Sequence, residues 1–421
     1  MAIFYRRVEI HGLERVPPRG PLVIAANHHN ALVDALLLLA MIPRRLTPLA
    51  KAPLFKNPLV APLLWLIGAI PVHRRQDAPA GDAGDRNAQM FAAASAALRR
   101  GDVILIFPEG VSQPEPLLQP LRTGLARMTL DTATGPSAAA VAVLPVGLVF
   151  HRPADFRTGS AVVMIGHPVI TADLADGGRR DPTEAVRELT DRVATALRAL
   201  IVEARDSETL RLLEVAHEVW QDDGEEAAGP ARVAWMREAV RRLHTLSPSL
   251  QDRVERVRQE FARYDKDAGA DDRRRQGAGR RQALRDGVLV VLGLPLALAG
   301  IVIHGLPYRA TVRTVRALKP EADVSATYQL SVGLVLFPLA WLIEASVLGR
   351  MVGAWAVWLF VALLVPAGFY ALSWRDRLRR LVREGRVWVT VLTGGEHDEG
   401  LAARRQWLRE ELVALARLTR T

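Results

Sequence analysis

Blocks of apolar and polar positions alternate along the first 170 residues and predict short strands separated by helices. The β-rich apolar runs cover residues 22–27, 103–107, 142–150 and 161–165. The helical patterns between them cover residues 31–41, 86–100 and 122–133. Because the strands are almost continuously apolar, we expect an α/β fold whose mixed β-sheet is covered by helices on both faces.

A helical region follows this α/β pattern. Asp181 can cap a helix that begins with Pro182. One apolar stripe follows, formed by Val186, Leu189, Val193, Leu197, Leu200 and Ile201. More helix is predicted to about residue 265, and the run 266–285, rich in Gly, Asp and Arg, is predicted to be a basic linker. We therefore expect an N-terminal domain at residues 1–265 with its core at 8–170.

Long apolar segments change the character of the chain near its C-terminus. They cover residues 287–303, 328–348 and 351–372. The third is long enough to cross a bilayer, which takes about 20 residues, whereas the first is short and contains Pro295. We expect C-terminal membrane helices at residues 286–373, made of two to three apolar segments and followed by a basic tail at 374–421.

Positive charge surrounds these segments and predicts their orientation. The formal net charge is +10, with arginine clusters before the first segment, between the first and second, and after the third. Only Arg350 lies between the second and third. The positive-inside rule then favours a hairpin of the second and third segments with its tip outside. Since the N-terminal stretch lacks the apolar core of a secretory signal, we expect the N-terminal domain and the tail on the cytoplasmic side of the inner membrane.

Composition narrows the possible chemistry. The sequence has no cysteine, which excludes disulfides, thiolate metal sites and a cysteine nucleophile. The arginine excess suits phosphate groups or an anionic membrane surface. A nucleic-acid partner is disfavoured, because the sequence has no zinc-finger, RRM-like or homeodomain-like pattern and carries long apolar segments.

The stretch AANHHNALVDALLLLA, residues 25–40, places two histidines directly before an apolar helix and Asp34 about one turn into it. A carboxylate that reaches back to an imidazole fixes its tautomer and leaves the other ring nitrogen free, as in a general base. The alternative is a capped helix, with Asn30 as N-cap and the histidines lining a loop. No metal is expected, because adjacent histidines rarely point at one ion and no fourth ligand is evident.

Two further stretches carry candidate binding residues. Phe107, Pro108, Glu109 and Gly110 follow an apolar strand, and ligands bind at the carboxyl ends of strands in open α/β sheets. The stretch GAIPVHRR ends in Arg74 and Arg75, whose guanidinium groups suit a phosphate monoester. The alternatives are an ordinary strand-to-loop turn and a solvated charged turn.

Taken in order, the blocks NHHNALVD, GAIPVHRR, FPEGVS with LRTGLARM, and VLPVGLVF resemble the four motifs of the glycerolipid acyltransferases. This family includes the glycerol-3-phosphate and 1-acylglycerol-3-phosphate acyltransferases, and the resemblance covers residues 8 to about 170. It implies transfer of a fatty acyl group from acyl-CoA or acyl carrier protein to a glycerol hydroxyl in phospholipid biosynthesis. It implies no cofactor beyond that co-substrate, and the bilayer as a partner.

The resemblance also implies roles for individual residues. A histidine acts as the general base and Asp34 orients it; the context favours His28, and His29 is the alternative base. The residues implied in substrate binding are Asn27, Arg74 or Arg75, Phe107, Pro108, Glu109 and Gly110. Val111 and Ser112 stand where many members have Thr-Arg, and we expect Arg122 to compensate for the lost arginine.

The apolar stretch 57–72 contains three prolines and Trp65. It is too broken for a spanning helix and predicts either an element lying in the membrane interface or a buried core helix. Two other functions stay open: a lysophospholipid acyltransferase or transacylase, and a non-catalytic lipid-binding membrane protein. The intact His–Asp and FPEG blocks disfavour the second.

Overall fold

The computed structural model describes residues 7–58, 60–73, 83–113, 115–134, 140–151, 160–174, 181–220, 229–244, 248–272, 280–318, 325–393, 403–404, 406–412 and 414. The chain divides into two compact units. The first comprises Met1–Glu214, Ala227–Thr245 and Glu321–Thr327. The second comprises Val215–Glu226, Leu246–Pro320 and Tyr328–Thr421.

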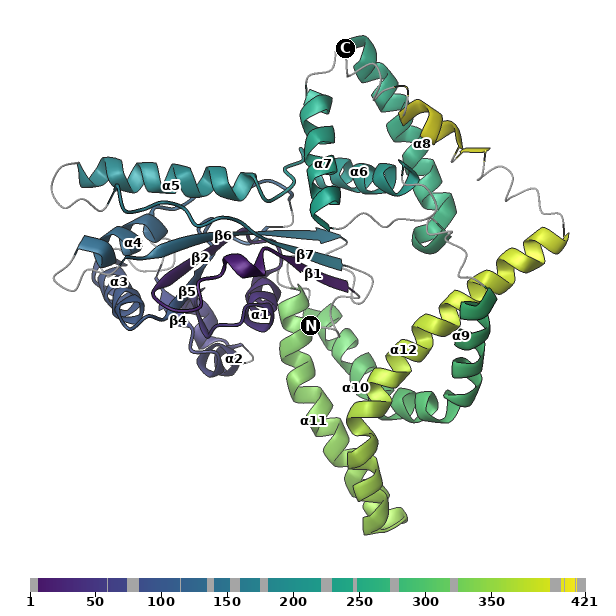
Figure 1. Ribbon diagram of the computed structural model, residues 1–421. Coiled ribbons are helices and arrows are strands. Elements are labelled where there is room, and N and C mark those ends of the chain that lie inside the picture. Colours follow the sequence, from purple (N-terminus) through teal and green to yellow (C-terminus); the bar gives the residue numbers. More distant parts are fainter. Residues whose placement is uncertain are drawn as a thin grey trace. The chain divides into compact units, whose positions relative to one another are not determined.

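A mixed sheet forms the centre of the first unit, and its seven strands in the described residues lie in the order β1-β7-β6-β2-β5-β3-β4 (Figure 1). Neighbouring strands are parallel except β6 and β7. The strands are β1 (Arg7–His11), β2 (Leu22–Ala26), β3 (Leu46–Lys51), β4 (Ile70–Val72), β5 (Val103–Ile106), β6 (Ala142–His151) and β7 (Ser160–Ile165). The apolar runs predicted β2, β5, β6 and β7. They missed β1, β3 and β4, which lie at or near the sheet edges and mix buried with partly exposed positions.

Helices cover both faces of this sheet. On one face, α1 (Ala31–Met41) packs against Leu22 and Ile24 of β2. On the other, α3 (Ala83–Arg99), α4 (Gly124–Thr134) and α5 (Pro182–Arg198) pack around Val23 and Ala25. Strand β2 is therefore buried on both sides, as its continuous apolar run predicts. The predicted fold class, a mixed sheet covered on both faces and followed by helices, is confirmed.

The connections that follow the two central strands diverge at the carboxyl edge of the sheet. The chain leaves β2 through α1 toward one face of the sheet, and it leaves β5 through α4 toward the other. Ligand sites in open α/β sheets lie where neighbouring strands send their connections to opposite faces. The carboxyl edge of β2 and β5 is therefore the expected place for a site.

The helical region after the sheet begins as predicted. Asp181 accepts a hydrogen bond of 2.9 Å from the backbone N–H of Thr183, and Pro182 is the first residue of α5. The apolar stripe of α5 is buried at Leu189, Val193 and Leu197. Two short elements, η2 (Ala52–Lys56) and α2 (Ala61–Leu66), join β3 to β4, and η1 (Leu13–Arg15) follows β1. Helices α6 (Ser207–Trp220) and α7 (Gly229–His244) come after α5.

The second unit is helical and contains α8 (Pro248–Asp272), α9 (Arg280–Leu292), α10 (Leu294–Leu318), α11 (Ser325–Met351) and α12 (Ala354–Thr393). Helix α8 belongs to it because Arg253 pairs with Glu411 at 2.7 Å and Glu260 with Arg404 at 3.5 Å. The boundary expected near residue 265 differs from this division. Both ends of the expected linker are helical, since α8 runs to Asp272 and α9 starts at Arg280; residues 273–279 lie outside the described residues.

Among the described helices, two stretches are long and apolar enough to cross a membrane, Tyr328–Met351 in α11 and Ala354–Leu378 in α12. The first stretch contains the second predicted segment, and the second stretch covers residues 354–372 of the third. The first predicted segment lies in a pair of helices, Arg285–Leu292 and Leu294–Leu318, bent by 59° at the break between them. At this bend the indole Nε1–H of Trp374 donates to the carbonyl of Val290 at 2.8 Å, and the hydroxyl of Tyr370 donates to that of Leu289 at 2.9 Å. These bonds satisfy carbonyls next to the helix break.

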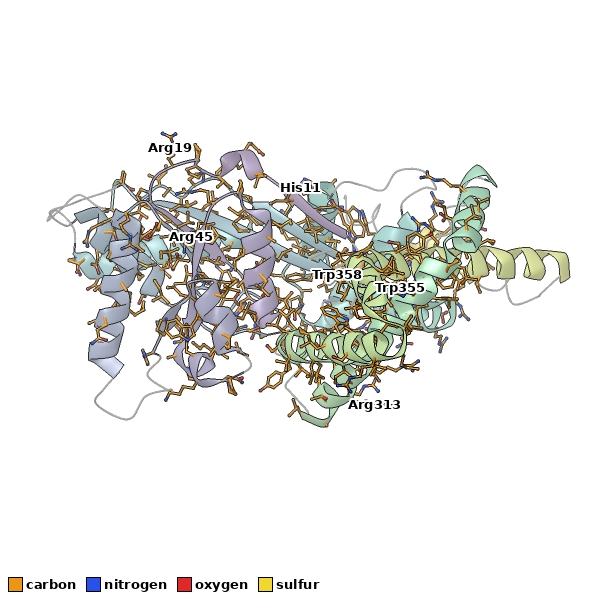
Figure 2. All side chains as sticks on the ribbon, turned by 90° about the horizontal axis from the view of Figure 1, so that it is seen from below. His11, Arg19, Arg45, Arg313, Trp355 and Trp358 are labelled. Atoms are coloured by element: carbon orange, nitrogen blue, oxygen red, sulfur yellow. The ribbon has the colours of Figure 1, made fainter. Side chains whose placement is uncertain are left out.

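Helix α12 continues beyond the last apolar segment. It runs without a break to Thr393, so the tail expected at residues 374–421 begins as helix. Near its start, Trp355 and Trp358 are 65% and 75% exposed; Figure 2 labels both. Exposed tryptophans at the end of an apolar helix are typical of the membrane–water interface.

Candidate active site

Two loops that leave neighbouring strands form the candidate site. Residues 27–30 connect β2 to α1, and residues 107–110 follow β5. The two strands are parallel, with Ala25 opposite Ile106, so both loops lie at the same carboxyl edge of the sheet. This edge thus carries the histidines after β2 and the FPEG block after β5.

His28 and Asp34 form a hydrogen-bonded pair. The distance from Nδ1 of His28 to Oδ2 of Asp34 is 2.9 Å, and the Asp34 side chain is fully buried. Because a carboxylate only accepts hydrogen bonds, Nδ1 is the donor and Nε2 of the neutral ring carries no hydrogen. Nε2 has no hydrogen-bond partner among the described residues, and the His28 side chain is 14% exposed. The His28 ring therefore presents Nε2 as a free hydrogen-bond acceptor at the carboxyl edge of the sheet.

Asp34 also holds the start of α1. Its Oδ2 accepts hydrogen bonds of 2.8 Å from the backbone N–H groups of His29 and Asn30. The first N–H groups of a helix lack partners within the helix, and here the cap bonds come from Asp34 rather than from the side chain of Asn30. The catalytic and the capping interpretations of this stretch are therefore compatible, since one carboxylate oxygen serves both.

Phe107 supports the His28 ring from one face. The two rings are stacked, with centroids 4.0 Å apart and planes inclined by 15°. The imidazole is thus fixed at Nδ1 by Asp34 and on one face by an aromatic ring. Such support reduces the number of ring orientations available before a substrate arrives.

The His29 ring is directed elsewhere. Its Nδ1 donates to the carbonyl of Gln113 at 3.0 Å, and the backbone N–H of Gln113 donates to the carbonyl of His28 at 3.2 Å. Phe150 meets the His29 ring edge-on at 6.3 Å. Of the two histidines, only His28 pairs its ring with Asp34 in this part of the chain. His29 instead fastens the loop that follows the FPEG block.

Glu109 connects the two loops of the site. It is 1% exposed, its Oε1 accepts from the backbone N–H of His28 at 2.8 Å, and its Oε2 accepts from that of Gln119 at 2.8 Å. Burial raises the pKa of Glu109, while the two N–H donors and the nearby histidines lower it in part. Both oxygens are occupied by backbone groups, so the carboxylate positions His28. Its predicted contact with substrate stays a prediction.

The turn after β5 brings Arg122 beside Gly110. The N–H of Gly110 donates to the carbonyl of Phe107, and Gly110 has a φ of 70°, in the region that favours glycine. A Cβ at this position would lie 3.4 Å from Cγ of Arg122. The backbone N–H of Arg122 donates to the carbonyl of Pro108 at 2.7 Å. The Arg122 side chain is exposed, and its guanidinium has no ion pair with any residue that the structure describes. An available cation therefore stands next to the FPEG block.

The remaining predicted residues differ in their surroundings. Asn27 is fully buried, and its amide exchanges two hydrogen bonds with the backbone of Leu148, at 2.9 Å and 2.6 Å. Its side chain thus binds the sheet, and a role in substrate binding stays a prediction. Arg74 and Arg75 lie outside the described residues. Sequence reasoning missed Gln113, Gln119 and Leu148, since backbone contacts between distant segments leave no pattern.

Part of the chain is similar in sequence to known acyltransferases. Residues 7–149 match the sequence profile of the Acyltransferase family. The chain is 25% identical over 304 residues to an uncharacterised acyltransferase of Schizosaccharomyces pombe, which covers 52% of this chain and 45% of that protein. It is 31% identical to glycerol-3-phosphate O-acyltransferase 2 of Saccharomyces cerevisiae, over 28% of this chain and 16% of that one.

A further relative is 1-acyl-sn-glycerol-3-phosphate acyltransferase alpha of Homo sapiens, 26% identical over 40% of this chain and 56% of that protein. The chain thus spans about half or less of the length of these relatives. The matched region holds β1 to β5 and most of β6, together with the histidine and FPEG loops. Residues 7–149 are therefore similar in sequence to the Acyltransferase family.

Proposed function

We propose that this protein is a membrane-bound O-acyltransferase that transfers a fatty acyl group from acyl-CoA or acyl carrier protein to a hydroxyl of glycerol-3-phosphate or 1-acylglycerol-3-phosphate. The observation that carries the proposal is the His28–Asp34 pair, with a free Nε2 at the carboxyl edge of the sheet. The names of the relatives support the class of acceptor.

The proposed mechanism needs one base. Nε2 of His28 takes the proton of the acceptor hydroxyl while the oxygen attacks the carbonyl carbon of the thioester. The new C–O bond forms, the C–S bond breaks, and the proton passes from His28 to the departing thiolate. The negative charge of Asp34 stabilises the imidazolium during this transfer. No covalent acyl-enzyme is required.

We assign recognition of the acceptor phosphate to Arg122. Its exposed guanidinium stands beside Gly110 and is available for a charge-assisted contact. Arg74 and Arg75 remain proposed phosphate ligands on the resemblance alone. Binding of the phosphate holds the acceptor hydroxyl within reach of His28. Such positioning raises the rate because the reaction then proceeds as if it were intramolecular.

The apolar helices support a membrane location, and the arginine distribution supports a catalytic domain on the cytoplasmic side. A lysophospholipid acyltransferase would use the same base, and the acceptor that is acylated distinguishes it from the proposed enzyme. A non-catalytic lipid-binding relative would have no need of a carboxylate-held imidazole with a free nitrogen.

The test is an acyl-transfer assay on the full chain in membranes, with glycerol-3-phosphate, 1-acylglycerol-3-phosphate and lysophospholipids as acceptors. The neighbouring histidines provide a matched pair of variants. We expect His28→Ala to abolish turnover and His29→Ala to retain most of it, because only His28 pairs its ring with Asp34. If His29→Ala were inactive and His28→Ala active, the base would be His29. If the wild type acylated none of these acceptors, the enzyme proposal would fail.

A further inference from the structure

Helix α2 exposes two large apolar side chains, one of which, Trp65, has only an edge-on contact with Phe55 among the ring contacts of the described residues. Trp65 is 64% exposed and the adjacent Leu66 is 82% exposed. The opposite face of the same helix is buried through Leu64, which packs with Val60 and Ala69. The element is thus anchored in the first unit by one side and presents two large apolar side chains on the other. We call Trp65 and Leu66 the α2 patch.

The α2 patch belongs to the end of the sheet that carries the candidate site. Helix α2 follows the carboxyl end of β3, and β3 is parallel to β5. The cluster beneath the patch includes Leu32, in the first turn of α1 and four residues after His28. The same small cluster therefore touches the helix that holds Asp34 and supports the exposed face of α2.

The charge around α2 has one sign. Between Asp34 and Asp77 the sequence contains no acidic residue. Lys51 and Lys56 precede α2 in the sequence, and Lys56 is exposed. Basic groups near a membrane are attracted by anionic lipids. Arg44, further back, is occupied by the carbonyls of Pro17, Gly20 and Gly101. In the sequence, Lys56 lies nine residues before Trp65, and Arg74 and Arg75 lie eight and nine residues after Leu66.

We infer that the α2 patch docks the first unit on the surface of a lipid bilayer. Tryptophan next to leucine on a short helix, with lysines beside it, is the composition of an element that lies in the interface. At six residues α2 is too short to cross a bilayer. The occupant is a bilayer rather than a second protein, since the described helices include two able to span a membrane and the flanking charge suits anionic lipid.

Docking by α2 turns the carboxyl edge of the sheet toward the lipid. A fatty acyl chain is poorly soluble in water, and a site at this edge receives it directly from the interface. This consequence rests on the proposed function, whereas the docking itself does not. The two are therefore tested by separate measurements.

The docking test uses the absence of cysteine, because any cysteine introduced into the chain is the only one. The full-length Leu66→Cys variant is labelled with a polarity-sensitive fluorophore and placed in nanodiscs of phosphatidylcholine with phosphatidylglycerol. The matched control is Ile170→Cys, which is 70% exposed and follows Val169, paired with Val143 near the amino end of β6. The two positions thus lie at opposite edges of the same sheet.

We expect the label at position 66 to shift to the blue, to be quenched severalfold more by doxyl-labelled lipid than the label at 170, and to resist aqueous iodide. Omitting phosphatidylglycerol should reduce this difference. Equal access of iodide to both labels overturns the inference, as does a lipid-quenched label at position 170 alone. Protection from iodide without quenching by doxyl lipid would indicate a protein partner and also overturn it.

Activity supplies the second measurement. The double variant Trp65→Ser with Leu66→Ser should fold, because both side chains are exposed. We expect a severalfold loss of transfer to acceptor embedded in the bilayer and little loss with a short-chain, water-soluble donor and acceptor. Equal loss with both substrates would show damage to the site and contradict delivery from the interface. An inactive wild type with a lipid-quenched label at 66 would reject the proposed function and keep the docking.

Discussion

Replacing Asp34 by asparagine separates the charge of this residue from its geometry. Three donors converge on Oδ2: Nδ1 of His28 and the backbone N–H groups of His29 and Asn30. The other oxygen, Oδ1, is buried without a hydrogen-bond partner in the described part of the chain. In Asp34→Asn the amide oxygen should occupy the position of Oδ2, since the two backbone donors require an acceptor there. His28 then keeps its tautomer, and only the negative charge is lost.

The expected loss of rate follows from that charge. Two unit charges about 4 Å apart interact by about 4 kcal/mol at an effective dielectric constant of about 20. If most of this energy stabilises the imidazolium in the transition state, kcat for Asp34→Asn falls roughly 100- to 1000-fold. For Asp34→Ala, kcat should fall further and the protein should unfold more easily. It leaves buried N–H groups without an acceptor, at a cost of about 1–3 kcal/mol each.

Initial rates of acyl transfer and thermal unfolding of both variants check this reasoning. The expected order of kcat is wild type, Asp34→Asn, Asp34→Ala, and Asp34→Asn should also lose some stability, because its NH2 group takes the buried position of Oδ1, which has no acceptor in the described part of the chain. A wild-type rate for Asp34→Asn would show that the charge is unimportant. Equal rates for two folded variants would show that the amide does not preserve the ring geometry.

Three further predictions concern the surroundings of the site. Glu109→Gln keeps only one of two backbone acceptors, so kcat should fall with little change in the KM of the acceptor; a large rise in KM alone would indicate a substrate ligand instead. Because burial raises the pKa of Glu109 above 4.5, its contribution to stability is fully present below pH 4.5 and is lost as the pH rises through the raised value. Above pH 4.5 the free energy of unfolding of Glu109→Gln should therefore rise relative to that of the wild type, by at most about 1.4 kcal/mol per pH unit. Arg122→Ala should raise the KM of a phosphate-bearing acceptor about tenfold with partial recovery in Arg122→Lys, and an unchanged KM would exclude the contact. Gly12→Ala should destabilise the protein by about 2–5 kcal/mol, because φ is 85° and the added Cβ would lie 2.3 Å from the carbonyl oxygen of Ile165. Gly20→Ala, with φ of 89° and open space around it, should cost only about 1–3 kcal/mol, and an equal loss in both would rule out the steric part.

The sequence predicted those features of the fold that depend on local pattern. Strand β2 is apolar at every position because both faces are covered, and Asp181 caps α5 through a neighbour two residues away. The pairing of His28 with Asp34 was also accessible, since six residues and one helical turn separate the two side chains. Strand β4 has only partly buried residues and gives no such signal.

Contacts between distant segments could not be predicted in the same way. The bond from the backbone of His28 to Glu109 spans 81 residues, and the bonds of Asn27 to Leu148 span 121. A pattern of residue types marks these polar residues as unusual, but it does not indicate that their partners are backbone groups. The family resemblance implies substrate binding by Glu109 and Asn27, which stays a prediction, and the structure shows both side chains bonded to peptide groups.

The Asn27 amide has a consequence for how the site can move. Strand β2 pairs with β6 as far as Ala26 and Val146, and the amide of Asn27 then takes the place of one further peptide group by bonding both ways to Leu148. Toward β5 the pairing ends one residue earlier, at Ala25 and Ile106. Beyond these strand ends a side chain bridges each side of β2: Asn27 bonds to Leu148 of β6, and Glu109, from the loop after β5, accepts from the backbone N–H of His28. Movement of the site loops is therefore restrained on both sides of β2, and parting of the strands at this edge requires the loss of a buried side-chain hydrogen bond on either side.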